Sequence, residues 1–391
     1  MPVAHPWRPS PGGYKGGRED SIRYAQNRIA HEMLTRRTLL RLAAVLGGAR
    51  LTGAARPVLR AQPACPADAV EIDVRRLGDG PIIHPDLGGN IGTNIQGPSL
   101  IRVPDWVGEP LGRYYLYFAD HKGTYIRLAY ADALSGPWSI HEPGTLPLTT
   151  SHFLTEPPAL SDEVRRELAR APSRGEGVPS RLMSATQPHL ASPDVHVRPD
   201  RREIVMYFHG LEGPSVQRTR AAVSTDGLRF SARPDVLGRT YMRAFPYRGW
   251  WYALAMPGVL YRSRDGLQDF EEGPTLFEPT MRHSAVYRRR DTLYVFWTNV
   301  GDTPERILLS TIEIAGDWST WRATGRREVL RPEWEWEGAL LPREPSVRDA
   351  INIRVHQLRD PAIYVENDRL FLLYAVAGEA GIAIADLTLR C

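Results

Sequence analysis

Cysteine and lysine are almost absent from this chain of 391 residues, which has two of each against 47 arginines. Two cysteines exclude a disulfide-dense scaffold, and the H-x-H, C-x-x-C and H-E-x-x-H patterns of metal sites are missing. No apolar run reaches the ~20 residues of a membrane-spanning helix. Apolar residues make up 42% and charged residues 24%, which is globular composition. We therefore predict a globular protein without a metal site or other cofactor.

The excess positive charge of the chain lies at its beginning. Residues 1–62 hold 11 Lys and Arg against 3 Asp and Glu, whereas the remaining 329 residues hold 38 basic and 42 acidic residues, a net charge of −4. A mildly acidic body is poorly suited to capture a polyphosphate. We therefore expect no nucleic-acid partner.

The segment that begins at Met33 has the order of an export signal. Arg36 and Arg37 form a twin-arginine pair, an apolar stretch follows over 39–49, and small residues come next. An amphipathic helix of the mature fold is the alternative, and Met33 is a second candidate for the start of the protein. We predict that 1–62 is a leader, disordered or cleaved, and that the mature protein is periplasmic or secreted, with no membrane span.

After the leader, the chain repeats a pattern of short strands. Five copies each alternate apolar and polar residues over five to eight positions, are rich in β-branched and aromatic residues, and turn at Gly, Asp or Asn. Sheets of three to four strands that each need a neighbour to cover their faces indicate an all-β, five-bladed β-propeller over 63–391. A β-sandwich is the alternative fold.

Two segments depart from the repeat. The sequence SDEVRRELARA at 161–171 predicts a helix that Ser161 and Asp162 could cap, in an insertion at about 150–187 between the first two copies. The last copy lacks an outer strand, and the alternating segment 69–77 precedes the first copy. We expect this N-terminal segment to join the last blade and close the ring.

Ring closure of this kind would bring Cys65 near Cys391. An exported protein folds in an oxidising compartment, so we predict that the two cysteines form a disulfide. Two free thiols, or a lipid on Cys65, are the alternatives.

Propeller geometry predicts where polar side chains gather. The start of each innermost strand and the end of the second strand lie at one face of the ring, and the inner strands surround the axis. The polar residues at these positions include Asn94, Gln96, Asp120, His121, Lys122, His189, His209, Arg243, His283, Arg359 and Asp360. We predict that they line an axial ligand pocket. Each also has a structural alternative, such as a turn cap for Asp360 before Pro361.

The segments YYLYFADHKGTYIRLAYADALSGPW and LRDPAIYVENDRLFLLYAVAGEAGIAIADL resemble the five-bladed glycoside hydrolases of the family 43, 32 and 68 type. Ser-Gly-Pro-Trp after a strand is frequent in that superfamily. The resemblance implies a carbohydrate substrate and hydrolysis of an O-glycosyl bond by two carboxylates about 5–9.5 Å apart. It leaves open a structural cation on the axis, as some related propellers have.

The catalytic carboxylates of these families cannot be carried over by position. Where they have an Asp opening blade one, this chain has Gln96 and Gly97, and only blade five keeps an Asp, Asp360. We predict that Asp120 and Asp360 are pocket carboxylates, joined by Glu337 from the loop before blade five. The residues expected to bind substrate are Asn94, Gln96, His121, Lys122, His189, His209, Arg243, His283 and Arg359. A non-catalytic carbohydrate-binding propeller that has lost the family carboxylates is the alternative function.

Overall fold

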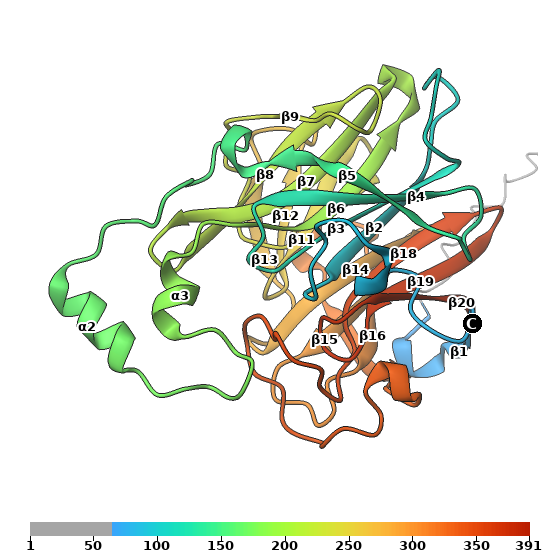
Figure 1. Cartoon of the computed structure of the whole chain (residues 1–391). Helices are drawn as coiled ribbons and strands as arrows, with labels where there is room; N and C mark the ends of the chain where they lie inside the picture. The colour runs from blue at the N-terminus through green and yellow to red at the C-terminus, as the bar shows by residue number, and fades with distance from the viewer. Residues whose placement is uncertain (1–64) are drawn as a thin grey trace, which may run out of the picture. The chain divides into compact units, whose positions relative to one another are not determined.

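The computed structural model describes residues 65–391, so the leader expected over 1–62 lies outside the described residues. In the described part, the strands form five four-stranded antiparallel sheets (Figure 1). In four sheets the spatial order of the strands is their order in the chain. This arrangement confirms the five-bladed β-propeller that the repeated strand pattern predicts.

The first three blades come from consecutive segments of the chain. Blade one comprises β2 (Gln96–Arg102), β3 (Tyr114–Ala119), β4 (Tyr125–Ala131) and β5 (Ser139–Pro147). Blade two comprises β6 (Leu190–Arg198), β7 (Glu203–Gly213), β8 (Val216–Ser224) and β9 (Ser231–Ala232). Blade three comprises β10 (Arg243–Tyr247), β11 (Trp250–Ala255), β12 (Val259–Ser263) and β13 (Glu271–Thr275).

The last two blades complete the ring. Blade four comprises β14 (Met281–Arg289), β15 (Thr292–Asn299), β16 (Ile307–Glu313) and β17 (Ala323–Leu330). Blade five comprises β18 (Arg359–Glu366), β19 (Arg369–Ala375), β20 (Ile382–Arg390) and, as its outermost strand, β1 (Glu71–Arg76).

Both ends of the described chain meet in blade five. β1 pairs antiparallel with β20, from Glu71 opposite Arg390 to Arg76 opposite Ala385 (Figure 1). Cys65 and Cys391 form a disulfide across 326 positions of sequence, with their Cα atoms 6.0 Å apart. The predicted pairing of the two cysteines is therefore confirmed.

The apolar core lies between the blades, in five clusters that each join one neighbouring pair. The alternation of a strand explains this division, because successive side chains point to opposite faces of a sheet. In β3, Tyr115 and Tyr117 pack toward blade two, whereas Leu116 and Phe118 pack toward blade five. Each sheet is thus covered on both faces, which is why all six residues of β3 are buried.

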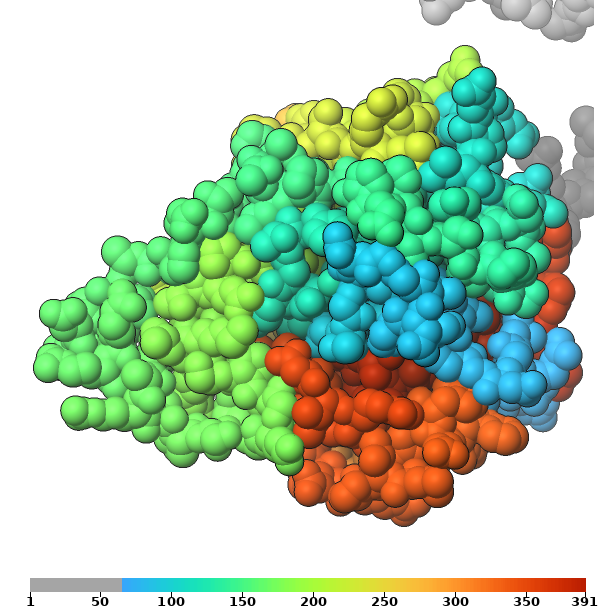
Figure 2. Space-filling view, viewed as in Figure 1, coloured from blue at the N-terminus to red at the C-terminus, as the bar shows by residue number. Residues whose placement is uncertain are grey.

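The insertion between blades one and two carries two helices, α2 (Asp162–Arg170) and α3 (Arg181–Thr186). The first was predicted: the Ser161 hydroxyl accepts a hydrogen bond from the backbone of Val164 and caps it. The second is too short to leave a sequence pattern. Figures 1 and 2 show the insertion (green) reaching away from the blades on one side. No helix in residues 65–391 is long and apolar enough to cross a membrane.

The inner strands are bent where they approach the axis. In β2, β6, β14 and β18 the pairing register shifts near the start of the strand, and the residues there are Gly97, Ser192, His283 and Asp360, all with positive φ. A β-bulge of this kind redirects one side chain out of the regular alternation. A side chain at Gly97 would meet the Cα of Ser192 at 2.9 Å, so only glycine fits there.

Candidate functional site

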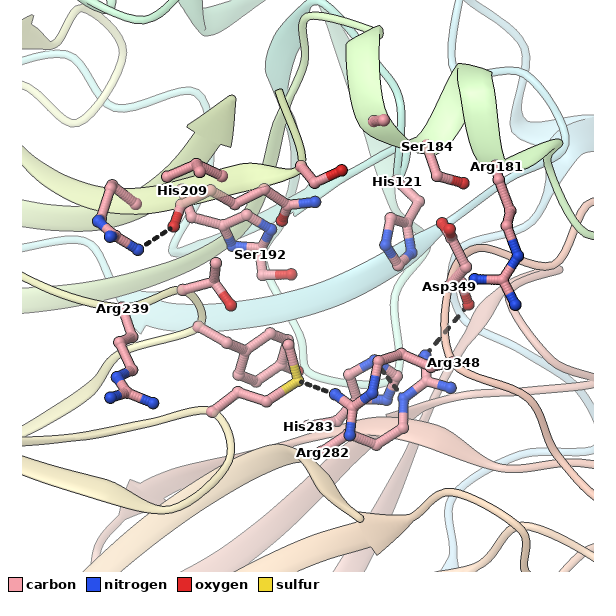
Figure 3. A pocket seen from close by; sticks show the side chains of 18 of the residues that line it. His121, Arg181, Ser184, Ser192, His209, Arg239, Arg282, His283, Arg348 and Asp349 are labelled. Carbon is pink, nitrogen blue, oxygen red and sulfur yellow. Dashed lines mark hydrogen bonds between the residues drawn. The ribbon is translucent and has the colours of Figure 1, made fainter. Parts of the chain in front are cut away.

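A cavity of about 470 Å³ opens at the end of the inner strands where these bulges lie. It is lined by strand and loop residues of the blades, by the insertion, and by the loop that leads into β18 (Figure 3). The insertion and that loop meet directly, since the backbone of Asn352 donates a hydrogen bond to the Gly177 carbonyl at 2.9 Å. We call this space the axial cavity.

Positive charge dominates the lining of the axial cavity. Its six arginines are Arg174, Arg181, Arg218, Arg239, Arg282 and Arg348, and Asp349 is the carboxylate among the lining residues. Figure 3 shows Arg181 descending from α3 on one side and Arg239 on the opposite side. Within residues 65–391, no carboxylate lies within 4.0 Å of Arg181, Arg218 or Arg348. These three guanidinium groups leave the cavity with uncompensated positive charge.

Asp349 holds two walls of the cavity together. Its carboxylate accepts a hydrogen bond from Arg174 of the insertion at 2.8 Å and lies 3.9 Å from the ammonium of Lys122 in blade one. Burial alone would raise the pKa of Asp349, but the charges of Lys122 and His121 lower it to about 2. Asp349 is therefore ionised at neutral pH and links the two walls.

Two buried histidines in the lining are neutral. Burial, with the neighbouring His189, holds the pKa of His209 well below its ordinary value, and burial with Arg282 does the same for His283. The Arg282 guanidinium donates to Nε2 of His283 at 2.9 Å, so this nitrogen is the acceptor and Nδ1 carries the proton. Neither imidazole adds a charge to the cavity at neutral pH.

Tyr241, at positive φ just before β10, lines the axial cavity, and we call Tyr241 with the residues that contact it the cavity floor. Its hydroxyl donates a hydrogen bond to Oδ1 of Asp360 at 2.8 Å. The guanidinium of Arg243 lies 4.3 Å from the centre of its ring, and the rings of His283 and His209 lie at 5.3 and 6.3 Å. Burial and the negative charge of Glu379 raise the pKa of Asp360 to about 6.

Several polar atoms around Tyr241 lack partners. Oδ2 of Asp360, Nη2 of Arg243 and Nδ1 of His209 are buried and have no hydrogen bond within the described residues. Buried polar atoms that the protein leaves unsatisfied are expected to meet water or a ligand. Of these three residues, only His209 lines the cavity, and Asp360 and Arg243 are buried beneath the lining.

Below the floor lies a group of fully buried charges, which we call the buried network: Arg282, Glu305, Arg359 and Glu379. Arg359 donates to Glu379 at 2.9 Å and lies 3.2 Å from Glu305. Burial alone would raise the pKa of Glu379, but the His121 charge and hydrogen bond, with Arg359, lower it. The network fixes the inner ends of blades four and five.

The predicted binding residues divide between the cavity and the layer beneath it. Only His121, His209 and His283 line the cavity itself. The others are buried around it: Asn94, Gln96, Lys122, His189, Arg243 and Arg359. Asn94, for example, donates to Glu379 at 2.8 Å, and His189 donates from Nδ1 to the Gln187 carbonyl at 2.8 Å. These six residues hold the lining residues in place, and we do not propose that they contact a ligand.

None of the three predicted carboxylates is among the lining residues, but Asp360 accepts a hydrogen bond from one of them, Tyr241. Asp120 accepts from the backbone of Lys122 at 2.8 Å within its own turn and is not among the lining residues. Glu337 is fully buried against Arg76 of β1, at 2.8 Å, and Tyr374. It caps a short helical turn and, contrary to the prediction, is not among the residues that line the axial cavity. The pairing with β1 explains the difference, because it places the half-buried Arg76 opposite that loop.

The arginines of the insertion and of the loop before β18 were missed by the sequence reasoning, as was Tyr241. Arg174 and Arg181 lie in the insertion, to which the repeat pattern assigns no position. Arg348 lies far from the start of any strand. One signal was present: Arg239 and Tyr241 precede the inner strand of blade three at the same face as Arg243.

Within residues 65–391, no group of three or more His, Cys, Asp or Glu is arranged to hold a metal ion. Fold and site together define a five-bladed β-propeller with a cationic axial cavity. No family model matches the chain. It is 32% identical over 352 residues to "Uncharacterized protein R118" of Acanthamoeba polyphaga mimivirus, covering 83% of this chain and 92% of that protein, and it belongs to the same family.

Solved structures similar to this chain include family 43 glycoside hydrolases. A β-xylosidase/α-arabinofuranosidase from a compost microbial metagenome is 12% identical, with 81% of this chain and 95% of that chain covered and a TM-score of 0.47. A family 43 enzyme from Xanthomonas citri is 12% identical, with 80% and 92% covered and a TM-score of 0.47. An N-acetylgalactosamine deacetylase from F. plautii is 12% identical, with 81% and 95% covered and a TM-score of 0.46.

Proposed function

We propose that the protein is a carbohydrate-active propeller whose axial cavity binds an acidic saccharide. The observation that carries the proposal is the charge of the lining, six arginines against Asp349, with Arg181, Arg218 and Arg348 free of any described carboxylate partner. Arginine presents a planar fork of donors that matches a carboxylate. An anionic group on the ligand would complete this arrangement.

Hydroxyl recognition supports a saccharide as the ligand. Ser184, Ser192, Ser215, Gln217 and Thr240 line the same cavity and can exchange hydrogen bonds with ring hydroxyls. His209 lines the cavity as well, and its Nδ1 has no hydrogen-bond partner within the described residues. A volume of about 470 Å³ is within the range of ligand-binding pockets. The resemblance of the blade sequences to glycoside hydrolases points to the same ligand class.

The test is a thermal-unfolding screen of the full chain with uronic oligosaccharides and neutral oligosaccharides of equal length. At about 100 times the Kd, a bound ligand adds about 2.7 kcal/mol to the free energy of unfolding. We expect the uronic series to raise the Tm and the neutral series to leave it unchanged. Equal stabilisation by both series, or by neither, would contradict an acidic ligand.

Single substitutions locate the binding site. Arg181→Gln and Arg218→Gln each remove one charged donor, so we expect the Kd for the uronic ligand to rise about 10- to 100-fold by calorimetry. The matched control is Arg170→Gln, which removes an exposed arginine from the same insertion, outside the cavity lining. A control that weakened binding as much would show that only the general charge matters.

Hydrolysis of a glycosidic bond is the second candidate function, and the Asp360–Tyr241 pair favours it. A carboxyl with a pKa of about 6 keeps its proton in mildly acidic solution, as a general acid requires. We expect release of reducing ends from a bound oligosaccharide, falling to background in Asp360→Asn and unchanged in Asp120→Asn. Stabilisation without release of new reducing ends would contradict hydrolysis and support binding as the only function of the cavity.

We also propose that the protein is exported. Residues 1–62 would be the leader, and residues 63–391 would be the exported propeller. The Cys65–Cys391 disulfide supports this, because such bonds persist in oxidising compartments. Fractionation of cells expressing the full chain tests it. The protein should appear outside the cytoplasm and stay inside when Arg36 and Arg37 are both changed to Lys.

A further inference from the structure

A second group of arginines lies at the other end of the blades, in a groove of about 560 Å³ between blades three and four. The turn from β10 to β11, the residue after β12 and the turn from β14 to β15 form its walls. Tyr241, just before β10, lies at the axial cavity, and Tyr247, the last residue of β10, lies in this groove six residues further along the chain. At about 3.3 Å per residue, the two sites are roughly 20 Å apart.

Aromatic rings hold the arginines of this groove, which we call the basic groove. The guanidinium of Arg264 lies 3.5 Å from the centre of the Trp250 ring, and those of Arg248 and Arg288 lie 5.0 and 5.8 Å from Tyr247. A guanidinium stacked by its face keeps the N–H groups at its edge available. The stacking therefore orders these donors without neutralising their charge.

The basic groove also has little negative charge of its own. Asp291 is the carboxylate among its lining residues; it accepts from the Tyr247 hydroxyl at 2.6 Å and from Arg248 at 3.2 Å. Within residues 65–391, no carboxylate lies within 4.0 Å of Arg264 or Arg288. These two arginines are ordered, accessible cations.

We infer that the basic groove is a second binding site, for an acidic polysaccharide whose carboxylate or sulfate groups meet Arg264 and Arg288. A single-stranded nucleic acid is less well matched, because base stacking needs open aromatic faces. Here the Trp250 ring carries Arg264 and Arg262, and the Trp251 ring carries Arg198. The 329 residues after the leader also have a net charge of −4, which gives no long basic track for a phosphate backbone.

The test is affinity electrophoresis of the full chain through gels that contain polygalacturonate, dextran sulfate or single-stranded DNA. We expect retention by the acidic polysaccharides, and at least tenfold weaker retention when Arg264 and Arg288 are both changed to Gln. The polymer that shows the larger loss identifies the oxyanion. Arg248→Gln, at an exposed side chain, gives a second variant should the double variant unfold.

The matched control is Arg289→Gln, since Arg289 is exposed, adjoins Arg288 and is not among the groove lining. The uronic-oligosaccharide affinity of the axial cavity should be unchanged in the variant with Arg264→Gln and Arg288→Gln, because these two residues are not among the cavity lining. That variant separates a failure of this site from a failure of the proposed function. Equal losses in the Arg289 control, stronger retention by DNA, or no retention of the wild type would overturn the inference.

Discussion

The axial cavity and the basic groove are both built from arginine, but they fix it in different ways. In the cavity and the network beneath it, carboxylates hold part of the guanidinium groups: Asp349 holds Arg174, and Glu305 and Glu379 hold Arg359. The other kind of cavity arginine has no carboxylate within 4.0 Å in residues 65–391, as in Arg181, Arg218 and Arg348. In the groove, aromatic rings hold the guanidinium groups, as Trp250 holds Arg264. A carboxylate fixes position and cancels charge, whereas a ring fixes position and leaves the charge in place.

This difference has a consequence for stability. A buried guanidinium between two buried carboxylates cannot be removed without leaving bare charges in the interior. A guanidinium on a surface ring can be removed at the cost of one modest contact. The arginines of the basic groove can therefore be substituted to test their function, whereas substitutions in the buried network destabilise the fold.

The largest expected effect comes from removing the central arginine of the buried network. Arg359→Ala leaves Glu305 and Glu379 without their shared partner, so we expect the free energy of unfolding to fall by about 3–5 kcal/mol. Urea denaturation measures the loss. The comparison variant is Arg264→Ala in the groove, which should cost less than about 1 kcal/mol. Similar losses in the two variants would erase the distinction between the sites.

Removal of the disulfide comes next. Cys65→Ser with Cys391→Ser frees the two ends of the described chain, so we expect a loss of about 3 kcal/mol in urea denaturation. Blade five carries Arg359, Asp360 and Glu379, whereas the groove belongs to blades three and four. Uronic-ligand affinity should therefore weaken more than polymer retention. The reverse order would contradict the assignment of the two sites.

The pH dependence of stability separates the two regions further. The pKa of Asp360 is raised, so its contribution is fully present below about pH 4 and is lost as the pH rises through about 6. A carboxyl pKa raised from 3.8 to about 6 corresponds to at most about 3 kcal/mol of stability. Unfolding measured from pH 4 to 7 should show this loss in the wild type and not in Asp360→Asn.

The groove titrates in a different range. Burial and the hydrogen bond to Asp291 raise the pKa of Tyr247 to about 12, so its contribution is lost only as the pH rises from about 10 toward 12. Tyr247→Phe should therefore leave the profile between pH 4 and 7 unchanged. A changed profile there would show that the groove and the cavity floor are coupled.

The smallest effect concerns salt. Exposed charges are screened more than buried ones. Raising NaCl from 0.1 to 0.5 M should weaken polygalacturonate retention several times more than it weakens uronic-oligosaccharide binding in the cavity. Electrophoresis and calorimetry over the same salt series provide the measurement, and parallel slopes would count against a sheltered cavity.

Much of the fold could be predicted because its signals are local. Alternation in segments such as 69–77 marks strands, and Ser161 before an acidic, helical segment marks α2. The proximity of Cys65 and Cys391 could be predicted because an N-terminal strand that closes the ring brings the two cysteines together. The site could be predicted only in part. Whether a side chain lines the cavity depends on how far it extends toward the axis as well as on the face of the ring from which it comes. His121 and His283 reach the cavity, whereas His189 at the same face is fully covered.

The sequence by itself determined five blades, their order and the end of each blade where polar side chains gather, since these follow from strand period and antiparallel pairing. Only the tertiary structure decided which charges meet. Ring closure placed Arg76 against Glu337, and the insertion placed Arg174 against Asp349. A carboxylate buried beside one arginine braces the fold, and an arginine left without a carboxylate is available for a ligand. That distinction depends on neighbours that are remote in the chain.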